Sequence, residues 1–192
     1  TFPTNEEHHP YNNRTLYGAA KIANELMLRS FNSMYGLNYN AMRYFNVYGP
    51  RMDIHGRYTE VLVRWYDAIK CGKEPLIYGD GKQTMDFVYI EDVARANIMA
   101  LRSDVNDEVF NVASGVETSL EELCLQLLEV MDSGIKPKYI PISDDRKKVE
   151  VRKRLADVNK AKKMIGFKSN VSLKEGLGKL VFPGNGIAIV EG

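Results

Sequence analysis

The chain is poor in cysteine, in long apolar runs and in net charge. It has only two cysteines, Cys71 and Cys124, and neither stands in a C-x-x-C or Cys/His spacing. Two thiols so far apart form no disulfide framework and suggest no zinc site. No apolar run approaches the roughly 20 residues that span a bilayer, and the first residues do not resemble a signal peptide. We therefore expect free core thiols in a soluble, cytoplasmic protein without a metal.

The composition is otherwise that of an ordinary globular protein. Hydrophobic residues make up 44% and charged residues 27% of the 192 residues, which is enough chain for a sizeable core. The formal net charge is +1. This balance gives no electrostatic reason to expect nucleic acid or a membrane as partner. A small anionic ligand held by a few placed cations remains compatible with it.

Helical and strand-like patterns alternate along the chain. A helical pattern runs from the N-cap candidates Asn12 and Asn13 to about Tyr35, and Gly36 ends it. Further helices are expected within 58–72, 90–103, 119–131, 157–165 and 172–181, and strands within 37–50, 74–90, 108–114 and 136–143. A Ser-x-x-Glu capping box opens the helix within 119–131, and the residues on either side of the Gly-Asp-Gly turn within 74–90 should form a strand pair. Such alternation predicts an α/β fold with parallel strand pairing, because each crossover must pass over a face of the sheet.

The stretch "RTLYGAAK" sets Tyr17 and Lys21 four residues apart at the start of the first helix. Residues at i and i+4 share a helix face, and the small residues between them leave room for a ligand. A phenol with its ordinary pKa of about 10 is a poor base at neutral pH. A nearby ammonium favours the phenolate and lowers that pKa. The spacing is therefore compatible with a proton-transfer pair.

Spacing alone does not decide the matter. Tyr66 and Lys70 have the same spacing near the end of a helix, and Tyr78 and Lys82 have it across a Gly-Asp-Gly turn. A chain with 11 tyrosines produces such pairs readily. On the residues alone, Tyr17 and Lys21 are equally well explained as two side chains on a solvated helix face.

The order of several motifs bears on this choice. "TLYGAAKIANE" is followed by "MRYFNVYGPR", "IYGDGKQTMDFVYIEDVARA", "FNVASGVETSLEEL" and "LADVNKAKKMIGF". In order and spacing these resemble the extended short-chain dehydrogenase/reductases, in particular the NAD-dependent nucleotide-sugar epimerases and dehydratases of the UDP-glucose 4-epimerase type. The resemblance implies the C-terminal part of a Rossmann-like parallel sheet with a smaller α/β lobe that binds the nucleotide-sugar.

The resemblance also implies roles for particular residues. Tyr17 would be the catalytic base, and Lys21 would hold the nicotinamide ribose of NAD and lower the tyrosine pKa. Asn46 would contact the diphosphate or sugar of the substrate, with a turn-forming asparagine as the structural alternative. The backbone around Tyr44 and Phe45 would touch nicotinamide or substrate, while their rings could be core. Asp92 is expected to be a cap or structural partner rather than a catalytic acid.

Two departures from the family pattern affect the expected phosphate site. Met85 stands where the family commonly has an arginine that binds a phosphate, and "RKKVEVRKR" replaces a later arginine and Gly-Asp. A diphosphate is commonly clamped by arginine, whose fork matches its oxygens. We therefore expect Arg146 or Arg152 to supply the clamp, the alternative being a solvated basic connector.

A third departure is the lack of a Gly-rich turn between a strand and a helix, which would bind the cofactor pyrophosphate. We expect the chain to be the C-terminal part of such an enzyme, inactive alone. Residues 1–50 would be the remnant of the NAD-binding domain, and 51–182 mainly the substrate lobe, with some elements returning to the Rossmann sheet. The tail 183–192 has no assigned role.

The expected activity is C4 epimerisation of a UDP-hexose or UDP-N-acetylhexosamine through a 4-keto intermediate, serving polysaccharide biosynthesis. A nucleotide-sugar 4,6-dehydratase or decarboxylase, and a non-catalytic module for nucleotide-sugar binding or dimerisation, remain alternatives. The resemblance further implies a homodimer through a four-helix bundle. Apolar residues within 19–31 and 61–69 would provide the bundle, although both stripes could equally be core.

Overall fold

The computed structural model describes residues 2–8, 13, 15–52, 61–142 and 152–181 of the chain. The helices are α1 (Leu16–Tyr35), α2 (Val61–Lys70), α3 (Ile90–Arg102), α4 (Leu120–Val130), α6 (Asn159–Ile165) and α7 (Leu173–Val181). The strands are β1 (Asn40–Tyr44), β2 (Asn46–Tyr48), β3 (Leu76–Tyr78), β4 (Thr84–Tyr89), β5 (Glu108–Val112), β6 (Glu117–Ser119) and β7 (Lys138–Ile140). The predicted α/β class is confirmed.

Helix α1 ends as predicted and begins slightly later than predicted. Gly36 adopts the left-handed conformation, with φ of 67°, and its N–H donates to the carbonyl of Asn32. The N-cap is Thr15, whose hydroxyl oxygen accepts from the N–H of Gly18 at 3.0 Å. Asn13 is not the cap; its side chain instead accepts from and donates to Thr15. The two asparagines expected as N-caps therefore lie before the capping residue.

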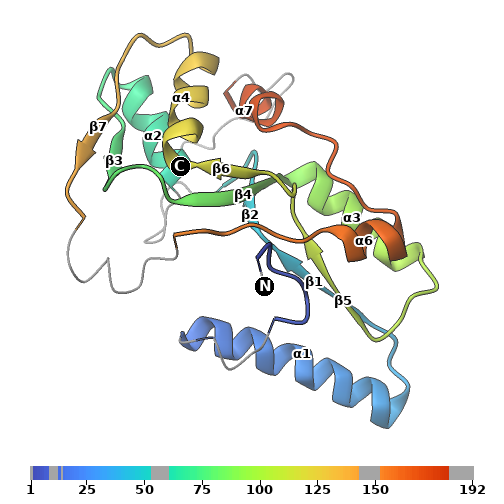
Figure 1. Ribbon diagram of the computed structural model, residues 1–192. Coiled ribbons are helices and arrows are strands. Elements are labelled where there is room, and N and C mark those ends of the chain that lie inside the picture. Colours follow the sequence, from blue (N-terminus) through green and yellow to red (C-terminus); the bar gives the residue numbers. More distant parts are fainter. Residues whose placement is uncertain (1, 9–12, 14, 53–60, 143–151, 182–192) are drawn as a thin grey trace.

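Strands β1 and β5 form a parallel pair with Asn40 opposite Glu108 and Tyr44 opposite Val112. Figure 1 shows α1 on one side of this pair and α3 on the other. Side chains that alternate along β1 reach both helices. Arg43 binds Glu25 of α1, whereas the hydroxyl of Tyr44 donates to Asn97 of α3 at 2.8 Å.

The remaining strands form two further sheets. β4 lies between β2, to which it is parallel, and β6, to which it is antiparallel. β3 pairs in parallel with β7, more than fifty residues later in the chain. We expected the segments of β3 and β4 to pair with each other across the Gly-Asp-Gly turn. That prediction is wrong, because the turn sends β3 to β7 and β4 into the central sheet.

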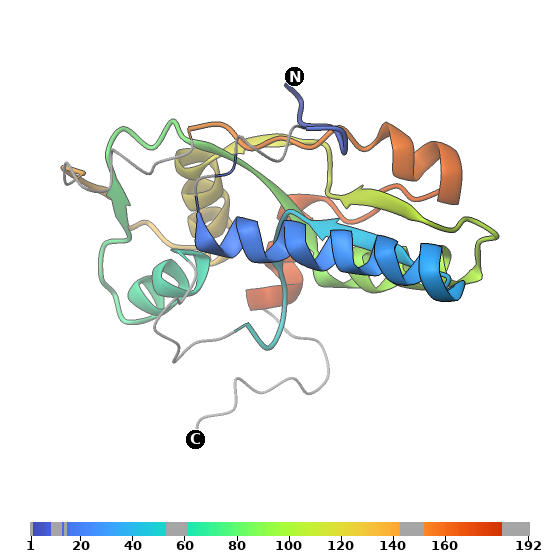
Figure 2. The same ribbon diagram turned by 90° about the horizontal axis from the view of Figure 1, so that it is seen from below.

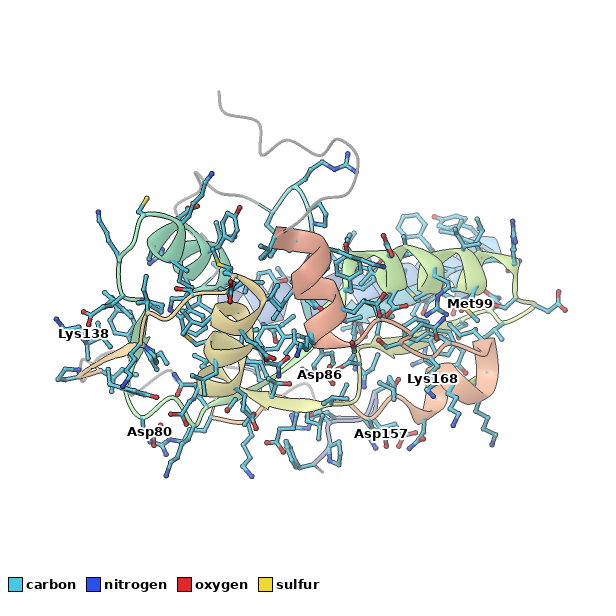
Figure 3. All side chains as sticks on the ribbon, turned by 90° about the horizontal axis from the view of Figure 1, so that it is seen from above. Asp80, Asp86, Met99, Lys138, Asp157 and Lys168 are labelled. Carbon is cyan, nitrogen blue, oxygen red and sulfur yellow. The ribbon has the colours of Figure 1, made fainter. Side chains whose placement is uncertain are left out.

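Two hydrophobic clusters make up the core. The larger one joins α2, α4 and α7 to β2, β3 and β4, and its buried residues include Trp65, Leu123, Leu127 and Leu177. The smaller one joins α3 and α6 to β1, β4 and β5, and includes Phe110, Val112 and Phe167. Figure 3 shows Lys138 of β7, the strand paired with β3 of the larger cluster, and Met99, which packs against the smaller cluster, toward opposite ends of the molecule. The domain boundaries expected from the sequence stay a prediction.

The apolar stripe of α2 belongs to this core. Leu62, Trp65 and Ile69 are buried in the larger cluster. Of the two alternatives left open for 61–69, these contacts favour the core stripe, and the four-helix bundle stays a prediction. Cys124 is a buried thiol as expected, but Cys71 is exposed at the end of α2. None of the described helices is long and apolar enough for a membrane span.

Two buried carboxylates tie distant segments together. Asp86 of β4 accepts hydrogen bonds from the N–H and hydroxyl of Ser114 and from the N–H of Gly115 and of Ala156. It lies in the middle of the molecule (Figure 3). Asp92, in the first turn of α3, accepts from Arg95 and from residues 169–171. The expected structural role of Asp92 agrees with these contacts.

Candidate active site

Tyr17 and Lys21 lie in the first two turns of α1, on one face of the helix. The ammonium nitrogen of Lys21 is 5.3 Å from the centroid of the Tyr17 ring, within the range of a cation–π contact. Tyr17 is 74% exposed. The phenol and the ammonium are therefore neighbours and both are open to a ligand.

The residue after Tyr17 has no space for a side chain. A Cβ atom on Gly18 would overlap the side-chain oxygen of Asn13 and approach its Cγ to 2.6 Å. Asn13 occupies this place because its amide bonds Thr15, the N-cap of the helix. The capping arrangement thus requires glycine directly beside the tyrosine.

A hollow of about 770 Å³ lies between α1 and the strands β1 and β2. Figure 2 shows α1 crossing the molecule in front of this part of the sheet. Polar or charged residues of α1 and β1 line one part of it: Tyr17, Lys21, Asn24, Glu25, Asn40 and Arg43. Mainly apolar residues from β2, the segment after it, α2 and β4 line another: Val47, Tyr48, Met52, Val61, Leu62 and Phe87. Its size and mixed lining suit a small organic ligand.

The three residues predicted from "YFNVYGP" line the same hollow. Tyr44, Phe45 and Asn46 stand where β1 passes into β2. The N–H of Phe45 donates to the carbonyl of Val112 at 3.1 Å, which holds this junction against β5. Asn46 is paired in register with Phe87. The structure therefore brings five of the predicted site residues to one concave surface.

Tyr48 lies in the hollow as well but is a structural phenol. It is 2% exposed, and its hydroxyl lies 3.3 Å from the carbonyl oxygen of Leu173 and 3.5 Å from that of Ser172. Burial raises the pKa of Tyr48 well above its ordinary value. A phenol held in this way is not a base near neutral pH.

The predicted phosphate clamp lies elsewhere. Arg152 is exposed on a segment beside β4, where its carbonyl accepts from the N–H of Thr84 at 2.9 Å. It is not among the described residues that line the hollow. Arg146 lies outside the described residues. Met85, in the place of the family's arginine, packs against the larger core. The clamp stays a prediction.

Sequence reasoning missed an ion pair inside the hollow. Arg43 of β1 and Glu25 of α1 both line it and bind each other through two hydrogen bonds. The available signal was weak: Glu25 follows Lys21 by four residues, and Arg43 is a single charge inside an apolar strand pattern. In the part of the chain that the structure describes, no group of three or more His, Cys, Asp or Glu side chains could hold a metal ion.

Comparison with known families gives one match. Residues 1–113 match the model of the NAD dependent epimerase/dehydratase family. This stretch covers more than half of the chain and includes α1, the β1–β2 junction and all five residues gathered at the hollow.

Individual proteins are similar over most of this chain. A putative UDP-glucose 4-epimerase of Methanocaldococcus jannaschii is 37% identical over 92% of this chain and 55% of its own length. A UDP-N-acetyl-alpha-D-glucosaminuronate decarboxylase of Bacillus cytotoxicus is 35% identical over 85% of this chain and 51% of its own length. The crystal structure of the Thermotoga maritima UDP-glucose 4-epimerase with UDP-glucose is 38% identical, with a TM-score of 0.84 over 94% of this chain and 56% of that one. The chain spans about half the length of these relatives.

Proposed function

Because the chain belongs to the NAD-dependent epimerase/dehydratase family, we propose that it is part of an enzyme that epimerises a UDP-sugar at C4. The observation that carries this proposal is the position of Tyr17 and Lys21. The ammonium nitrogen of Lys21 is 5.3 Å from the centroid of the Tyr17 ring, and both side chains line the same hollow as Asn46. A base, a cation and an amide at one concave surface are the groups that oxidation of a sugar hydroxyl needs.

In the proposed reaction Tyr17 takes the proton from the sugar 4-hydroxyl. The ammonium nitrogen of Lys21, 5.3 Å from the centroid of the Tyr17 ring, places a cation beside this phenol. Asn46 orients the sugar or diphosphate from the end of β1, where ligands of open α/β sheets bind. Bound NAD would supply the hydride acceptor for C4. To complete the inversion, the hydride would return to the other face of C4 and Tyr17 would give its proton back to the 4-oxygen.

The described residues fit one end of the cofactor. Lys21 can donate to ribose hydroxyls beside the Tyr17 ring, and the backbone at Tyr44 borders the same space. No Gly-rich strand-to-helix turn for a dinucleotide pyrophosphate occurs among the described residues. We therefore assign to these residues the nicotinamide-ribose end only.

The substrate diphosphate requires cations. We propose Arg152 or Arg146 for this role: Arg152 lies next to β4, and Arg146 belongs to the same basic run of the sequence. The parallel bridge between Thr84 and Lys153 places this segment beside the strand that carries Met85. The uridine diphosphate of a UDP-sugar would then extend from the hollow toward this edge.

A chimeric enzyme tests the proposal. In the M. jannaschii relative, the portion that matches this chain is replaced by the 192 residues, and conversion of UDP-glucose to UDP-galactose is followed with NAD present. We expect turnover, and we expect Tyr17→Phe to lower kcat by on the order of 10³-fold through loss of the base. Tyr66→Phe is the matched control, since Tyr66 and Lys70 have the same spacing; it should leave kcat unchanged.

The same chimera separates the alternative functions. A decarboxylase, as in the B. cytotoxicus relative, would release carbon dioxide from a UDP-uronic acid and leave UDP-glucose unchanged. A 4,6-dehydratase would yield a 4-keto-6-deoxy sugar. A binding module would retain UDP-sugar affinity, show no turnover and be indifferent to Tyr17→Phe. The last outcome would contradict the proposed function.

We further propose that the complete enzyme is a cytoplasmic homodimer that uses α1. Exposed apolar residues lie along this helix: Leu26, Met27, Phe31 and Met34. We propose that these residues pack against the same residues of a second copy of the chain, because a two-fold interface is self-complementary. Sedimentation of the chimera tests this. Met27→Lys should convert dimer to monomer, whereas Leu101→Lys, at an exposed apolar position on α3, should not.

A further inference from the structure

Glu25 and Arg43 form a two-pronged ion pair between α1 and β1. Arg43 donates from Nε to Glu25 Oε1 at 2.7 Å and from Nη2 to Oε2 at 2.6 Å. The side chains are 23% and 34% exposed, so the pair is largely removed from water. The remaining guanidinium nitrogen, Nη1, donates to the carbonyl of Glu6 at 2.8 Å. All three guanidinium nitrogens are therefore engaged.

Packing does little to fix α1 in the structure. None of its residues, all of which are described, is buried. Two other side-chain links between α1 and the body lie farther along the helix: Arg29 is 3.9 Å from Asp107 in an exposed pair, and Asn32 donates to Asn106 at 3.4 Å. Glu25 thus provides the strong side-chain tether closest to the first turns of α1.

The tether lies on the same helix face as the proposed proton-transfer pair. Tyr17, Lys21 and Glu25 follow one another at intervals of four residues, so each is rotated only about 40° from the last. On β1, Arg43 stands three residues before Asn46. The planar guanidinium of Arg43 binds the Glu25 carboxylate through two parallel hydrogen bonds. Such a pair fixes both the position of Glu25 along the helix axis and the rotation of α1, which a point charge does not.

We propose that Glu25 and Arg43 are positioning residues that hold the Tyr17–Lys21 face of α1 toward the end of β1. This inference rests on the proposed function for its catalytic consequence. In the proposed reaction neither residue touches substrate or cofactor. Their effect is to set the rotation of α1, so that the phenol and the ammonium point across the hollow to Asn46.

Amide hydrogen exchange on the 192-residue chain tests the positioning without any ligand. Loss of a charge-assisted hydrogen bond lets this part of the helix open more readily, so we expect Arg43→Lys and Glu25→Gln to speed exchange in residues 18–25 by about tenfold or more. Exchange in α4 should not change. Arg29→Gln, which removes the exposed ion pair on the same helix, is the matched control. It should leave the amide exchange rates of residues 18–25 unchanged.

Kinetics of the chimera test the consequence for catalysis. A misplacement of about 1 Å can lower turnover by on the order of 10²-fold. We expect Arg43→Lys to lower kcat by about 10- to 100-fold while KM changes by less than about twofold. The double change Glu25→Arg with Arg43→Glu restores opposite charges and should recover most of the lost kcat, which a purely structural role for either side chain would not produce.

The outcomes separate the two proposals. Unchanged exchange in residues 18–25 for both variants overturns the positioning role, as does a fall in kcat that merely tracks loss of global stability. If the chimera with the unaltered chain is inactive, that result counts against the proposed function. The exchange experiment needs no activity, so it still decides whether the ion pair of Glu25 and Arg43 holds α1 in place.

Discussion

The hydroxyl of Tyr48 lies where a side chain on Gly176 would have to stand. A Cβ atom on Gly176 would overlap this hydroxyl and lie 2.7 Å from Cζ and 2.9 Å from Cε2 of the ring. Gly176 is buried in α7, and Tyr48 lines the hollow from β2. The glycine therefore lets the C-terminal helix close over the strand that follows the candidate site.

Replacing this glycine should destabilise the chain. Overpacking a filled core costs about 1–3 kcal/mol, which outweighs the gain of up to about 1 kcal/mol that alanine brings to a helix. We expect Gly176→Ala to lower the free energy of unfolding by about 1–2 kcal/mol. Urea unfolding followed by the fluorescence of Trp65, the single tryptophan, measures it.

Gly178 in the same helix is the control. A Cβ there would meet nothing within 4 Å, so Gly178→Ala should raise the free energy of unfolding by about 0.5–1 kcal/mol. If Gly176→Ala and Gly178→Ala change the free energy of unfolding equally, the Tyr48 ring shifts without an energetic penalty. Tyr48→Phe combined with Gly176→Ala should recover part of the loss.

Asp92 makes stability depend on pH. Burial alone would raise its pKa, but the hydrogen bonds from Val171, Arg95, Ser169 and Asn170 together outweigh burial and lower it. A folded-state pKa below the unfolded value of about 3.9 means that the ionised group stabilises the fold fully above that pH. This contribution is lost as the pH falls through the folded-state pKa.

We therefore expect Asp92→Asn to lower the free energy of unfolding by about 2 kcal/mol at pH 7, because it removes charge-assisted hydrogen bonds at a side chain that is 1% exposed. The difference between the chain and the variant should narrow as the pH falls below about 4. Denaturant unfolding from pH 7 to pH 3 gives both curves. If the difference in free energy of unfolding between the chain and the variant stayed constant from pH 7 to pH 3, this result would contradict the lowered pKa of Asp92.

Local patterns in the sequence were sufficient where local physics decides the structure. Gly36 ended α1, and the Ser-x-x-Glu box began α4, because caps act within a few residues. The motif order led to Tyr17, Lys21, Tyr44, Phe45 and Asn46, which now line one hollow. Their roles remain proposals, but their proximity is a property of the fold.

Features that depend on long-range geometry were not accessible. The partner of β3 is β7, and nothing in the residues of either strand specifies that pairing. An apolar stripe such as that of α2 is expected both for a helix that faces the core and for one that faces a second subunit. Only the packing of Trp65 in the larger cluster shows that this stripe faces the core. Glu25 and Arg43 are eighteen residues apart, and their contact depends on how α1 lies over β1.

The capping box of α4 should contribute measurably to stability. The hydroxyl of Ser119 accepts from the N–H of Glu122 at 3.1 Å, and the carboxylate of Glu122 accepts from the N–H of Ser119 at 2.7 Å. Loss of an N-cap costs about 0.5–2 kcal/mol, so we expect about 1 kcal/mol for Ser119→Ala. In a double-mutant cycle with Glu122→Ala the losses should be less than additive, because the bonds are reciprocal. Strict additivity would mean that the two bonds act independently.

The final prediction concerns Gly18, because it couples the helix cap to the candidate catalytic tyrosine. An alanine there overlaps the side chain of Asn13, which must leave Thr15. We expect Gly18→Ala to speed amide exchange in the first two turns of α1 by about tenfold, because the displaced Asn13 side chain no longer holds Thr15, the N-cap of the helix.

Removing the obstructing side chain should reverse this effect. In Asn13→Ala with Gly18→Ala the overlap is absent and alanine favours the helix over glycine by about 1 kcal/mol, so exchange should return toward that of the unaltered chain. In the chimera, kcat should follow the same order, falling with Gly18→Ala and recovering in the double variant. If the Gly18→Ala variant alone keeps the amide exchange rates and the kcat of the unaltered chain, then Asn13 moves aside freely and the helix cap does not require glycine beside Tyr17.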